Sequence, residues 1–391
     1  MSTKNQKTKN GTFQTGRVVL LSACHFIHDI YSSFLAPLLP FIIEKFSLSL
    51  TQAGLLSTVM QLPALLNPFI GKLADRISVR YFIILAPMLT AVPMSLLGLA
   101  PHYGVVMILL FFTGISVSLF HVPAPVMVYR VAGNKTGRGM SFYMTGGELA
   151  RAVGPIAIIA VVSVLGFDGY YPVMLIGILA SLMMFLKFKD IPLATHHREA
   201  PSILRTCREM KGLLGPLAAI VLFRGFMHAS LSTFLPLYII QKTSDIWLAG
   251  ISLSVFEAAG VVGIMTVGTL SDRFGRKRML SFCLIVAPIS LLLFICSPSW
   301  LQFPFLILTG FSLLSTTPVM LAMVQEFSED GSSSANGVFM MISFLARSAV
   351  VVLVGFIADQ IGLEKTYLLC AMVGFLSIPF VLKIKRADGG K

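Results

Sequence analysis

The sequence predicts an all-α polytopic membrane protein with twelve transmembrane helices, arranged as two parallel six-helix repeats. The first observation is composition: of 391 residues, 56% are hydrophobic and 12% are charged, and the mean hydropathy is +0.85. So few charged side chains cannot cover the surface of a water-soluble domain. The second observation is run length, since a bilayer core of about 30 Å needs roughly 20 apolar residues per helix. Continuous runs of this length exclude the short alternating strands of a membrane barrel.

Twelve apolar runs, separated by charged residues or by Pro and Gly, give the expected helices. In chain order the first six are expected at 17–43, 52–74, 80–100, 104–129, 139–165 and 170–189. The second six are expected at 213–241, 247–271, 277–297, 300–326, 334–358 and 364–386. The first run is not a signal peptide, because it is too long, contains His and Asp, and ends without a small-residue cleavage site.

The formal net charge of +13 indicates orientation in a membrane and not nucleic-acid binding. With the amino terminus placed in the cytoplasm, the loops on the outer side hold only Lys45, Lys242 and Lys365 of the 30 Lys and Arg residues. This asymmetry follows the positive-inside rule and predicts that both termini are cytoplasmic. We expect a monomer in the lipid bilayer of a bacterial inner membrane, with no nucleic-acid partner.

Matching segments divide the chain into two halves. FIHDIYSSFL at 26–35 is followed 200 residues later by FMHASLSTFL at 226–235. GKLADR at 71–76 matches GTLSDR at 268–273, at an offset of 197 residues. LAR occurs at 149–151 and again at 345–347, at an offset of 196 residues. Three matches in the same order indicate an internal repeat. We expect a six-helix bundle over 1–189, a cytoplasmic linker over 190–212 and a second bundle over 213–391. Parallel repeats of this kind place a binding site between the halves, near the membrane midplane.

The segment GTLSDRFGRKR (268–278) contains the loop motif G-x-L-x-D-R-x-G-R-K/R, and GKLADRISVR (71–80) contains its first part. In the first copy Ser78 replaces the second glycine and Val79 the first basic residue. On these motifs and its twelve spans the chain resembles the major facilitator superfamily. The resemblance implies a cytoplasmic latch between the halves, in which glycine permits close helix approach and aspartate faces a helix amino terminus. The gating residues that it implies are Gly71, Asp75, Arg76, Gly268, Asp272, Arg273, Gly275 and Arg276.

Further motifs narrow this resemblance. GISVSLFHVPA (114–124), the His–Asp element of the first helix and GELARAVGP (147–155) are similar to the fosmidomycin-resistance branch of bacterial efflux proteins. The fourth-helix arginine of many drug–proton antiporters is absent, and Leu109 and Leu110 lie near its place. The RAVGP part resembles the Gly-Pro element that antiporters carry in helix five, which favours export. Gly146, Gly147 and Gly154, with Ala150 between them, form a small-residue stripe that predicts close helix packing.

Six ionisable residues fall well inside helices, where each costs on the order of 3 kcal/mol at the membrane centre. They must therefore pair or line a water-filled cavity. Glu148 and Arg151 can neutralise each other on one helix, and Arg224 could pair with Glu257 between the seventh and eighth helices. Arg347 lacks such a local partner, so it either binds a phosphonate or carboxylate of the substrate or pairs with a distant acid such as Asp29 or Glu257. The substrate and proton pathway is expected to comprise Asp29, His25, His28, His121, Glu148, Arg151, Arg224, Glu257 and Arg347.

His25, His28 and Asp29 share one face of the first helix. A histidine beside a carboxylate suits a proton relay, although the histidines could also bond a neighbouring helix. His228 recurs beside Ala229 without an acid, which favours a structural role for His28 and makes Asp29 the sharper candidate. These ligand types also suit a metal ion, but the sequence identifies no fourth ligand, so no metal site is predicted.

The expected function is proton-coupled efflux of a small organic compound that is anionic and drug-like, with the proton gradient in place of a cofactor. The alternatives are proton-coupled uptake of an organic anion, export of a metal chelate, and a sensor that binds a ligand without moving it. An enzyme is not expected, because the sequence contains no P-loop, nucleophile elbow or HExxH motif.

Overall fold

A computed structural model describes residues 13–67, 69–70, 80–133, 136–189, 208, 210–327 and 333–384. In this part of the chain the regular structure is helical throughout. Eleven helical segments are long and apolar enough to cross a membrane, and the shorter apolar segment Leu50–Leu66 supplies the twelfth span. The predicted twelve-helix membrane architecture is confirmed.

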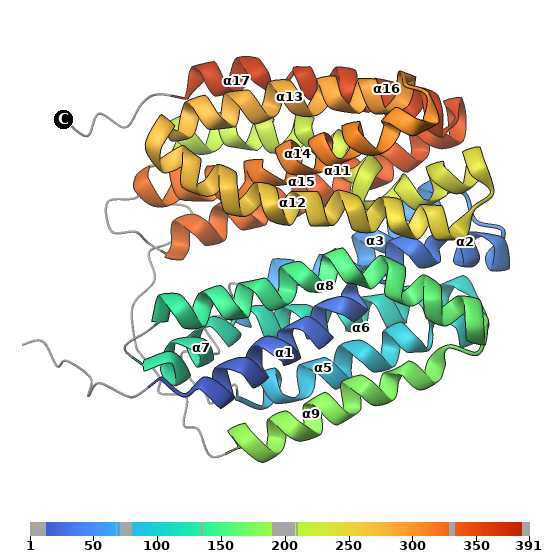
Figure 1. Ribbon diagram of the computed structural model, residues 1–391, viewed down its shortest axis with the longest axis vertical. Coiled ribbons are helices and arrows are strands. Elements are labelled where there is room, and N and C mark those ends of the chain that lie inside the picture. The colour runs from blue at the N-terminus through green and yellow to red at the C-terminus, as the bar shows by residue number, and fades with distance from the viewer. Residues whose placement is uncertain are drawn as a thin grey trace, which may run out of the picture.

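The helices form two bundles, one above the other in Figure 1. The first bundle contains α1 (Thr15–Ser32), α2 (Leu35–Phe46), α3 (Leu50–Gln61), η1 (Leu62–Leu66), α5 (Arg80–Ser95), η2 (Leu97–Leu99), α6 (Tyr103–His121), α7 (Ala124–Ala132), α8 (Thr136–Leu165), η4 (Tyr171–Val173) and α9 (Met174–Phe188). The second contains α11 (Lys211–Thr243), α12 (Ile246–Phe274), α13 (Arg276–Cys296), α14 (Ser299–Phe327), α15 (Ser333–Ile361), α16 (Leu363–Phe375) and α17 (Ile378–Lys383). Most of the predicted linker lies outside the described residues.

Two spans of the first bundle break where proline removes a helical hydrogen bond. Pro37 has no amide hydrogen for the carbonyl of Ser33, and the first span divides there into α1 and α2. Pro125 likewise cannot bond the carbonyl of His121, the last residue of α6. His121 therefore lies at a break in the middle of the fourth span.

The small residues of α8 allow α1 to pack closely against it. A Cβ added at Gly146 would lie 2.4 Å from the backbone oxygen of Ser22, and one at Gly154 would lie 1.8 Å from Ser33 Oγ. Side chains at these positions would force the helices apart, so the predicted role of the small-residue stripe in close helix packing is confirmed.

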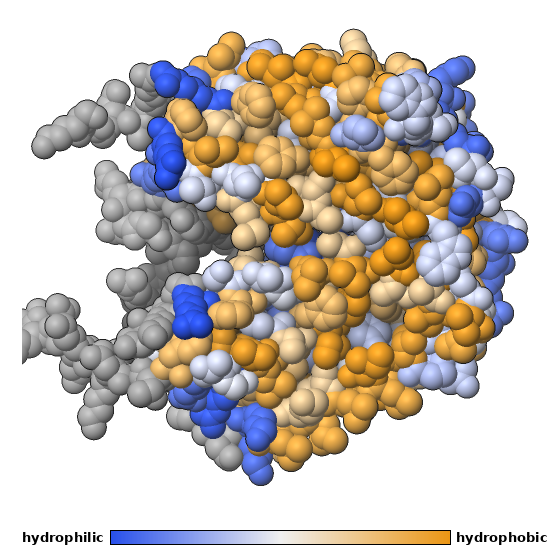
Figure 2. Space-filling view, in the orientation of Figure 1, coloured by the Kyte–Doolittle hydropathy of each residue, from blue (hydrophilic) through white to orange (hydrophobic). Residues whose placement is uncertain are grey.

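The surface has the polarity of a membrane protein. Apolar side chains cover the middle of the face in Figure 2, while hydrophilic side chains gather at its two ends. One end contains two ion pairs within single halves: Lys45 Nζ lies 2.7 Å from Asp168 Oδ1, and Lys242 Nζ lies 3.1 Å from Glu364 Oε1. The opposite end contains the start of α1 and the end of α17 (Figure 1).

The halves are joined at the end that contains Lys45. There the carboxylate of Asp359, on α15, accepts hydrogen bonds from the amides of Leu50 and Thr51 at the start of α3, at 2.7 and 2.9 Å. Gly355 supports this contact, since a Cβ there would lie 2.4 Å from the oxygen of Leu50. At the opposite end the surface is hollowed between the halves (Figure 2). The molecule is thus closed at one end and open at the end where the chain's first helix begins.

Candidate substrate and cation site

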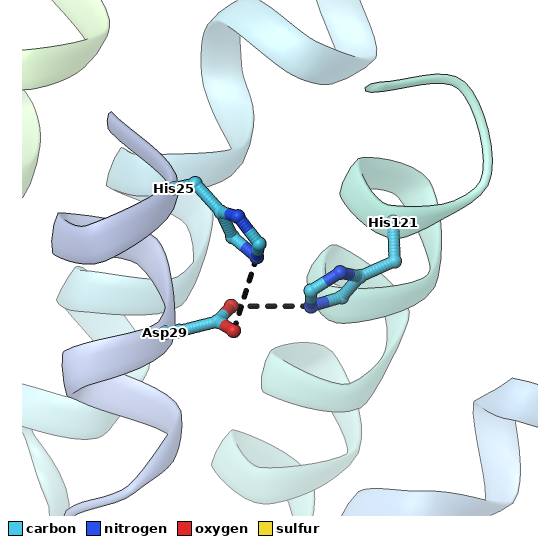
Figure 3. Close-up of side chains that lie close together, drawn as sticks. All are labelled: His25, Asp29 and His121. Carbon is cyan, nitrogen blue, oxygen red and sulfur yellow. Dashed lines mark ion pairs between the residues drawn. The ribbon is translucent and has the colours of Figure 1, made fainter. Parts of the chain in front are cut away.

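The centre of the first half contains a carboxylate surrounded by histidines. Asp29, on α1, lies 3.2 Å through Oδ2 from His25 Nε2 and 3.1 Å through Oδ1 from His121 Nε2, as Figure 3 shows. His28 Nε2 lies 4.0 Å from Oδ1. The structure therefore brings the three histidine candidates of the first half together around one acid, and it places His121 opposite α1.

Aromatic rings hold these imidazoles in position. The ring of His25 stacks on Tyr143 with centroids 4.0 Å apart, and the ring of His28 stacks on Phe120 at 4.4 Å. His28 is fully buried, whereas 39% of the His121 side chain is exposed. His121 is consequently the most exposed member of the histidine cluster around Asp29.

Gly147, on α8, packs directly against the side chains of His25 and Asp29. A Cβ at this position would lie 2.6 Å from His25 Nε2 and 2.9 Å from Asp29 Oδ2. Any side chain would displace one of these groups, so the glycine is needed for the cluster formed by His25, Asp29 and His121.

Arg151 connects the two halves electrostatically. Its guanidinium forms an ion pair with Glu148 on the same helix, as predicted, and its Nε lies 4.0 Å from Glu257 Oε2 on α12. The side chain of Arg151 is 45% exposed although it lies mid-span, because it faces the space between the bundles. Asp29 is also close enough to interact with this charge.

The predicted pair between Arg224 and Glu257 is wrong. Arg224, on α11, instead donates to Thr317 Oγ1 at 2.8 Å, because its side chain points towards α14, while Glu257 points across the interface towards Arg151. The Arg224 side chain is buried, and its Nε has no hydrogen-bond partner among the described residues.

A small pocket, with a cavity volume of about 10 Å³, lies between α11 and α15. Its wall contains Arg224, His228, Ser343 and Arg347. Arg347 contacts the ring of Phe344, with its guanidinium carbon 5.9 Å from the centroid. No carboxylate of the described residues lies within ion-pair distance of either pocket arginine. The pocket, which we call the arginine pocket, therefore presents two guanidinium groups without a directly bonded carboxylate among the described residues.

The two histidines of the repeated element have different surroundings. His28 contacts Thr90 on α5, whereas His228 contacts Ser232 on its own helix and faces the arginine pocket. The shared structural role expected from the repeat is therefore limited to their position in the helix.

The second copy of the loop motif joins helices of the second half only. Gly275 separates α12 from α13 with φ of +93°, a conformation that favours glycine. Arg276 lies 2.5 Å from Asp272 and 3.0 Å from Glu326 on α14. A Cβ at Gly268 would meet no atom of the described residues within 4 Å, so these residues show no close helix approach at this glycine. Arg273 is exposed, and the first copy, with Gly71, Asp75 and Arg76, lies outside the described residues.

Several polar groups of the site carry no clear sequence signal. Tyr143 contributes a backbone carbonyl, which any residue could supply, and Thr90 and Ser343 are single hydroxyls in apolar runs. Asp359 could have been identified as one more acid within a helix, because it precedes the end of α15 by two residues.

Comparison with known proteins agrees with the fold. The fosmidomycin resistance protein of Escherichia coli (strain K12) is 24% identical over 367 residues, covering 92% of this chain and 90% of that protein. The uncharacterized MFS-type transporter YfnC of Bacillus subtilis (strain 168) is 25% identical over 383 residues, covering 95% and 93%. A crystal structure of a bacterial homolog to the human lysosomal transporter Spinster, inward-facing and occupied, superposes with a TM-score of 0.81 at 14% identity, covering 95% and 96%.

The sequence profile of the Major Facilitator Superfamily matches twice, at residues 21–263 and 217–390, and together these matches span both bundles. The architecture, the interface with its charged residues and the relatives all describe a transporter of small molecules and not an enzyme. The chain belongs to the Major Facilitator Superfamily.

Proposed function

We propose that this transporter exports small organic anions from a bacterial cell, driven by the proton gradient. It acts as a monomer in the inner membrane, with both termini cytoplasmic. The observation that carries the proposal is the arginine pocket, in which Arg224 and Arg347 face one space without a carboxylate partner among the described residues. Arg224 is buried and Arg347 is partly exposed, and two neighbouring cations that repel each other are stabilised by a bound anion.

The chemistry of the arginine pocket favours an oxyanion. Guanidinium groups offer paired N–H donors that match a carboxylate or a phosphonate, and His228 and Ser343 add polar contacts at the same wall. The name of the Escherichia coli relative supports a drug-like phosphonate as one substrate.

Asp29 supports the proton-coupling part of the proposal. Its carboxylate is 10% exposed and contacts His121, whose side chain is 39% exposed. A proton that binds His121 is then one imidazole away from Asp29. The first half therefore holds the coupling cation, while the second half holds the anion.

The open end of the molecule supports loading from the cytoplasm. If the start of α1 faces the cytoplasm, as the positive-inside rule indicates, the hollow in Figure 2 opens inward. The Spinster homolog with a TM-score of 0.81 was crystallised in an inward-facing conformation. Export then requires closure of this end and separation of α3 from α15 at the other.

The test uses purified protein in proteoliposomes with an imposed pH gradient and a panel of anions that includes fosmidomycin. We expect uptake into inverted vesicles, and Arg347→Lys should weaken anion binding at least about tenfold, roughly 1.4 kcal/mol. Arg151→Lys should be milder, because Glu148 already holds that guanidinium. Arg17→Lys, at the exposed start of α1, is the matched control.

Each alternative gives a different result. Accumulation only in right-side-out vesicles would establish uptake. Binding without any transport or exchange would establish a sensor. Unchanged anion affinity in a well-folded Arg347→Lys protein would remove the arginine pocket from substrate binding.

A further inference from the structure

We propose that His25, Asp29 and His121 form a binding site for a divalent transition-metal ion. One ligand atom from each of these residues lies within 4.8 Å of the others, and the three side chains point towards one another (Figure 3). The sequence alone identified no ligand for such a site outside α1. The structure supplies it in His121, from the break in the fourth span.

A backbone carbonyl fixes the tautomer of His25. Its Nδ1 lies 2.7 Å from the oxygen of Tyr143, which can only accept a hydrogen bond, so Nδ1 carries the hydrogen. In the neutral ring Nε2 then has a lone pair, and this lone pair faces Asp29 Oδ2 at 3.2 Å. Two electron-rich atoms at this distance repel each other unless a cation lies between them. Metal-binding histidines commonly donate their second ring N–H to a carbonyl in this way.

A chain of hydroxyl groups fixes His28 in the same way. Ser116 donates to the carbonyl of Ala86 at 3.0 Å, so Thr90 donates to Ser116 at 2.7 Å and accepts from His28 Nδ1 at 2.9 Å. The Nε2 lone pair of His28 consequently faces Asp29 as well, at 4.0 Å. His28 lies one step outside the three ligands and is available as a fourth.

Three buried polar atoms that face one another in this cluster have no hydrogen-bond partner among the described residues. His25 Nε2, His28 Nε2 and Asp29 Oδ1 are buried and make no hydrogen bond, although His25 is only 4% and Asp29 only 7% exposed. Buried polar atoms are rarely left unpaired, because each then loses the free energy of hydration without compensation. An ion between them would satisfy all three atoms at once.

The distances and ligand types favour zinc or a similar ion. With metal–ligand distances of about 2.0–2.1 Å, tetrahedral geometry separates neighbouring ligand atoms by roughly 3.3 Å. The observed separations are 3.2 Å from His25 Nε2 to Asp29 Oδ2 and 3.1 Å from His121 Nε2 to Asp29 Oδ1, so each imidazole lies at its own oxygen of the carboxylate, and one atom from each residue lies within 4.8 Å of the others. Two imidazoles and one carboxylate suit Zn²⁺, Co²⁺ or Ni²⁺ better than the oxygen-seeking Ca²⁺ or Mg²⁺. The exposed face of His121 provides the path of entry.

The charges of the first half also favour a cation. Glu148 and Arg151 form an ion pair on α8 and neutralise each other. The carboxylate of Asp29 therefore leaves a formal charge of −1 on this half when the histidines are neutral. A divalent ion at the cluster would offset that charge.

The experiment measures Zn²⁺ and Co²⁺ binding to the full-length detergent-solubilised protein, prepared without a histidine tag. We expect one ion per chain and the visible absorption bands of tetrahedral Co²⁺. His121→Gln and Asp29→Asn should each weaken Zn²⁺ binding at least about tenfold, since each removes a ligand. His121→Gln is the safer variant for folding, because this side chain is partly exposed.

Histidines elsewhere provide the controls. His102 is exposed at the opposite end of α6, and the sequence has two adjacent histidines, His196 and His197. Replacing these three with alanine should leave the affinity unchanged. Loss of binding in this control, no stoichiometric binding, or unchanged binding in folded His121→Gln would each overturn the proposal.

A transport measurement separates the metal site from the proposed function. Only this measurement rests on the proposed function. Zn²⁺ and the coupling proton would compete for Asp29, so Zn²⁺ should inhibit proton-driven transport by the unaltered protein, and removal of Zn²⁺ with a chelator should restore it. Transport that proceeds in a protein unable to bind Zn²⁺ refutes the metal site alone. Metal binding in a protein that moves no anion refutes the proposed function alone.

Discussion

Replacing Asp359 with asparagine should open the closed end of the molecule. The carboxylate accepts two backbone hydrogen bonds and one from Thr51 Oγ1 at 2.5 Å, all at the amino terminus of α3 in the other half. The substitution leaves α3 itself intact, because Ser49 and Gln52 form a capping box at its start. The perturbation therefore acts on the contact between the halves.

The expected magnitude follows from the contacts. A hydrogen bond to a charged group contributes about 1.5–3 kcal/mol and a neutral one about 0.5–1.5. A negative charge at an exposed helix amino terminus contributes about 0.3–1 kcal/mol. Because Asp359 is exposed to solvent, the lower values apply. Asp359→Asn should therefore destabilise the contact between the halves at the closed end by about 1 kcal/mol. This is roughly a fivefold shift in the ratio of conformations, since 1.4 kcal/mol is tenfold.

Pulsed electron–electron double resonance can measure this shift in the ratio of conformations. Nitroxide labels at Glu44 and Gln241, exposed at this end on opposite halves, report its opening in a background without the native cysteines. Asp168→Asn is the matched control, because Asp168 pairs with Lys45 within the first half. The reasoning is refuted if Asp359→Asn leaves the distance distribution unchanged, or if Asp168→Asn changes it equally.

Three further predictions use single substitutions. Gly147→Ala should destabilise the protein by about 1–3 kcal/mol and lower its melting temperature, because the added methyl group clashes with His25. Gly215→Ala should be neutral, because a Cβ at that position meets no atom of the described residues within 4 Å. Equal melting temperatures of the two variants would contradict the packing described. His102→Cys should react with an impermeant maleimide from outside intact cells, and labelling only from the cytoplasm would reverse the orientation. Asp29→Asn should abolish transport driven by a pH gradient while leaving exchange of substrate, and substrate concentrated against its gradient by this variant would exclude Asp29 from coupling.

The sequence was sufficient for features that depend on length, period or local spacing. The twelve spans follow from apolar runs matched to the bilayer, and the ion pair of Glu148 with Arg151 follows from their separation of three residues on one helix. The glycine stripe of α8 was recognisable because small residues at helical spacing indicate close packing.

Contacts between distant helices could not be predicted in this way. His121 and Asp29 are 92 residues apart, and their contact depends on how the break before Pro125 directs the end of α6. The proposed pair of Arg224 with Glu257 failed for the same reason. Sequence assigns each residue to a helix, but the rotation of that helix against its neighbours is decided by packing.

The near-repeat of FIHDIYSSFL and FMHASLSTFL explains how the two halves differ in charge. Asp29, Glu148 and Arg151 give the first half a net charge of −1, and Arg224, Glu257 and Arg347 give the second half +1. The six charges sum to zero, so the interface can form without a net buried charge. Because Asp29 has become Ala229 in the second copy, the negative excess remains on the first half and the positive excess on the second. A cation therefore finds its ligands at His25, Asp29 and His121, while an anion finds its own in the arginine pocket across the same interface.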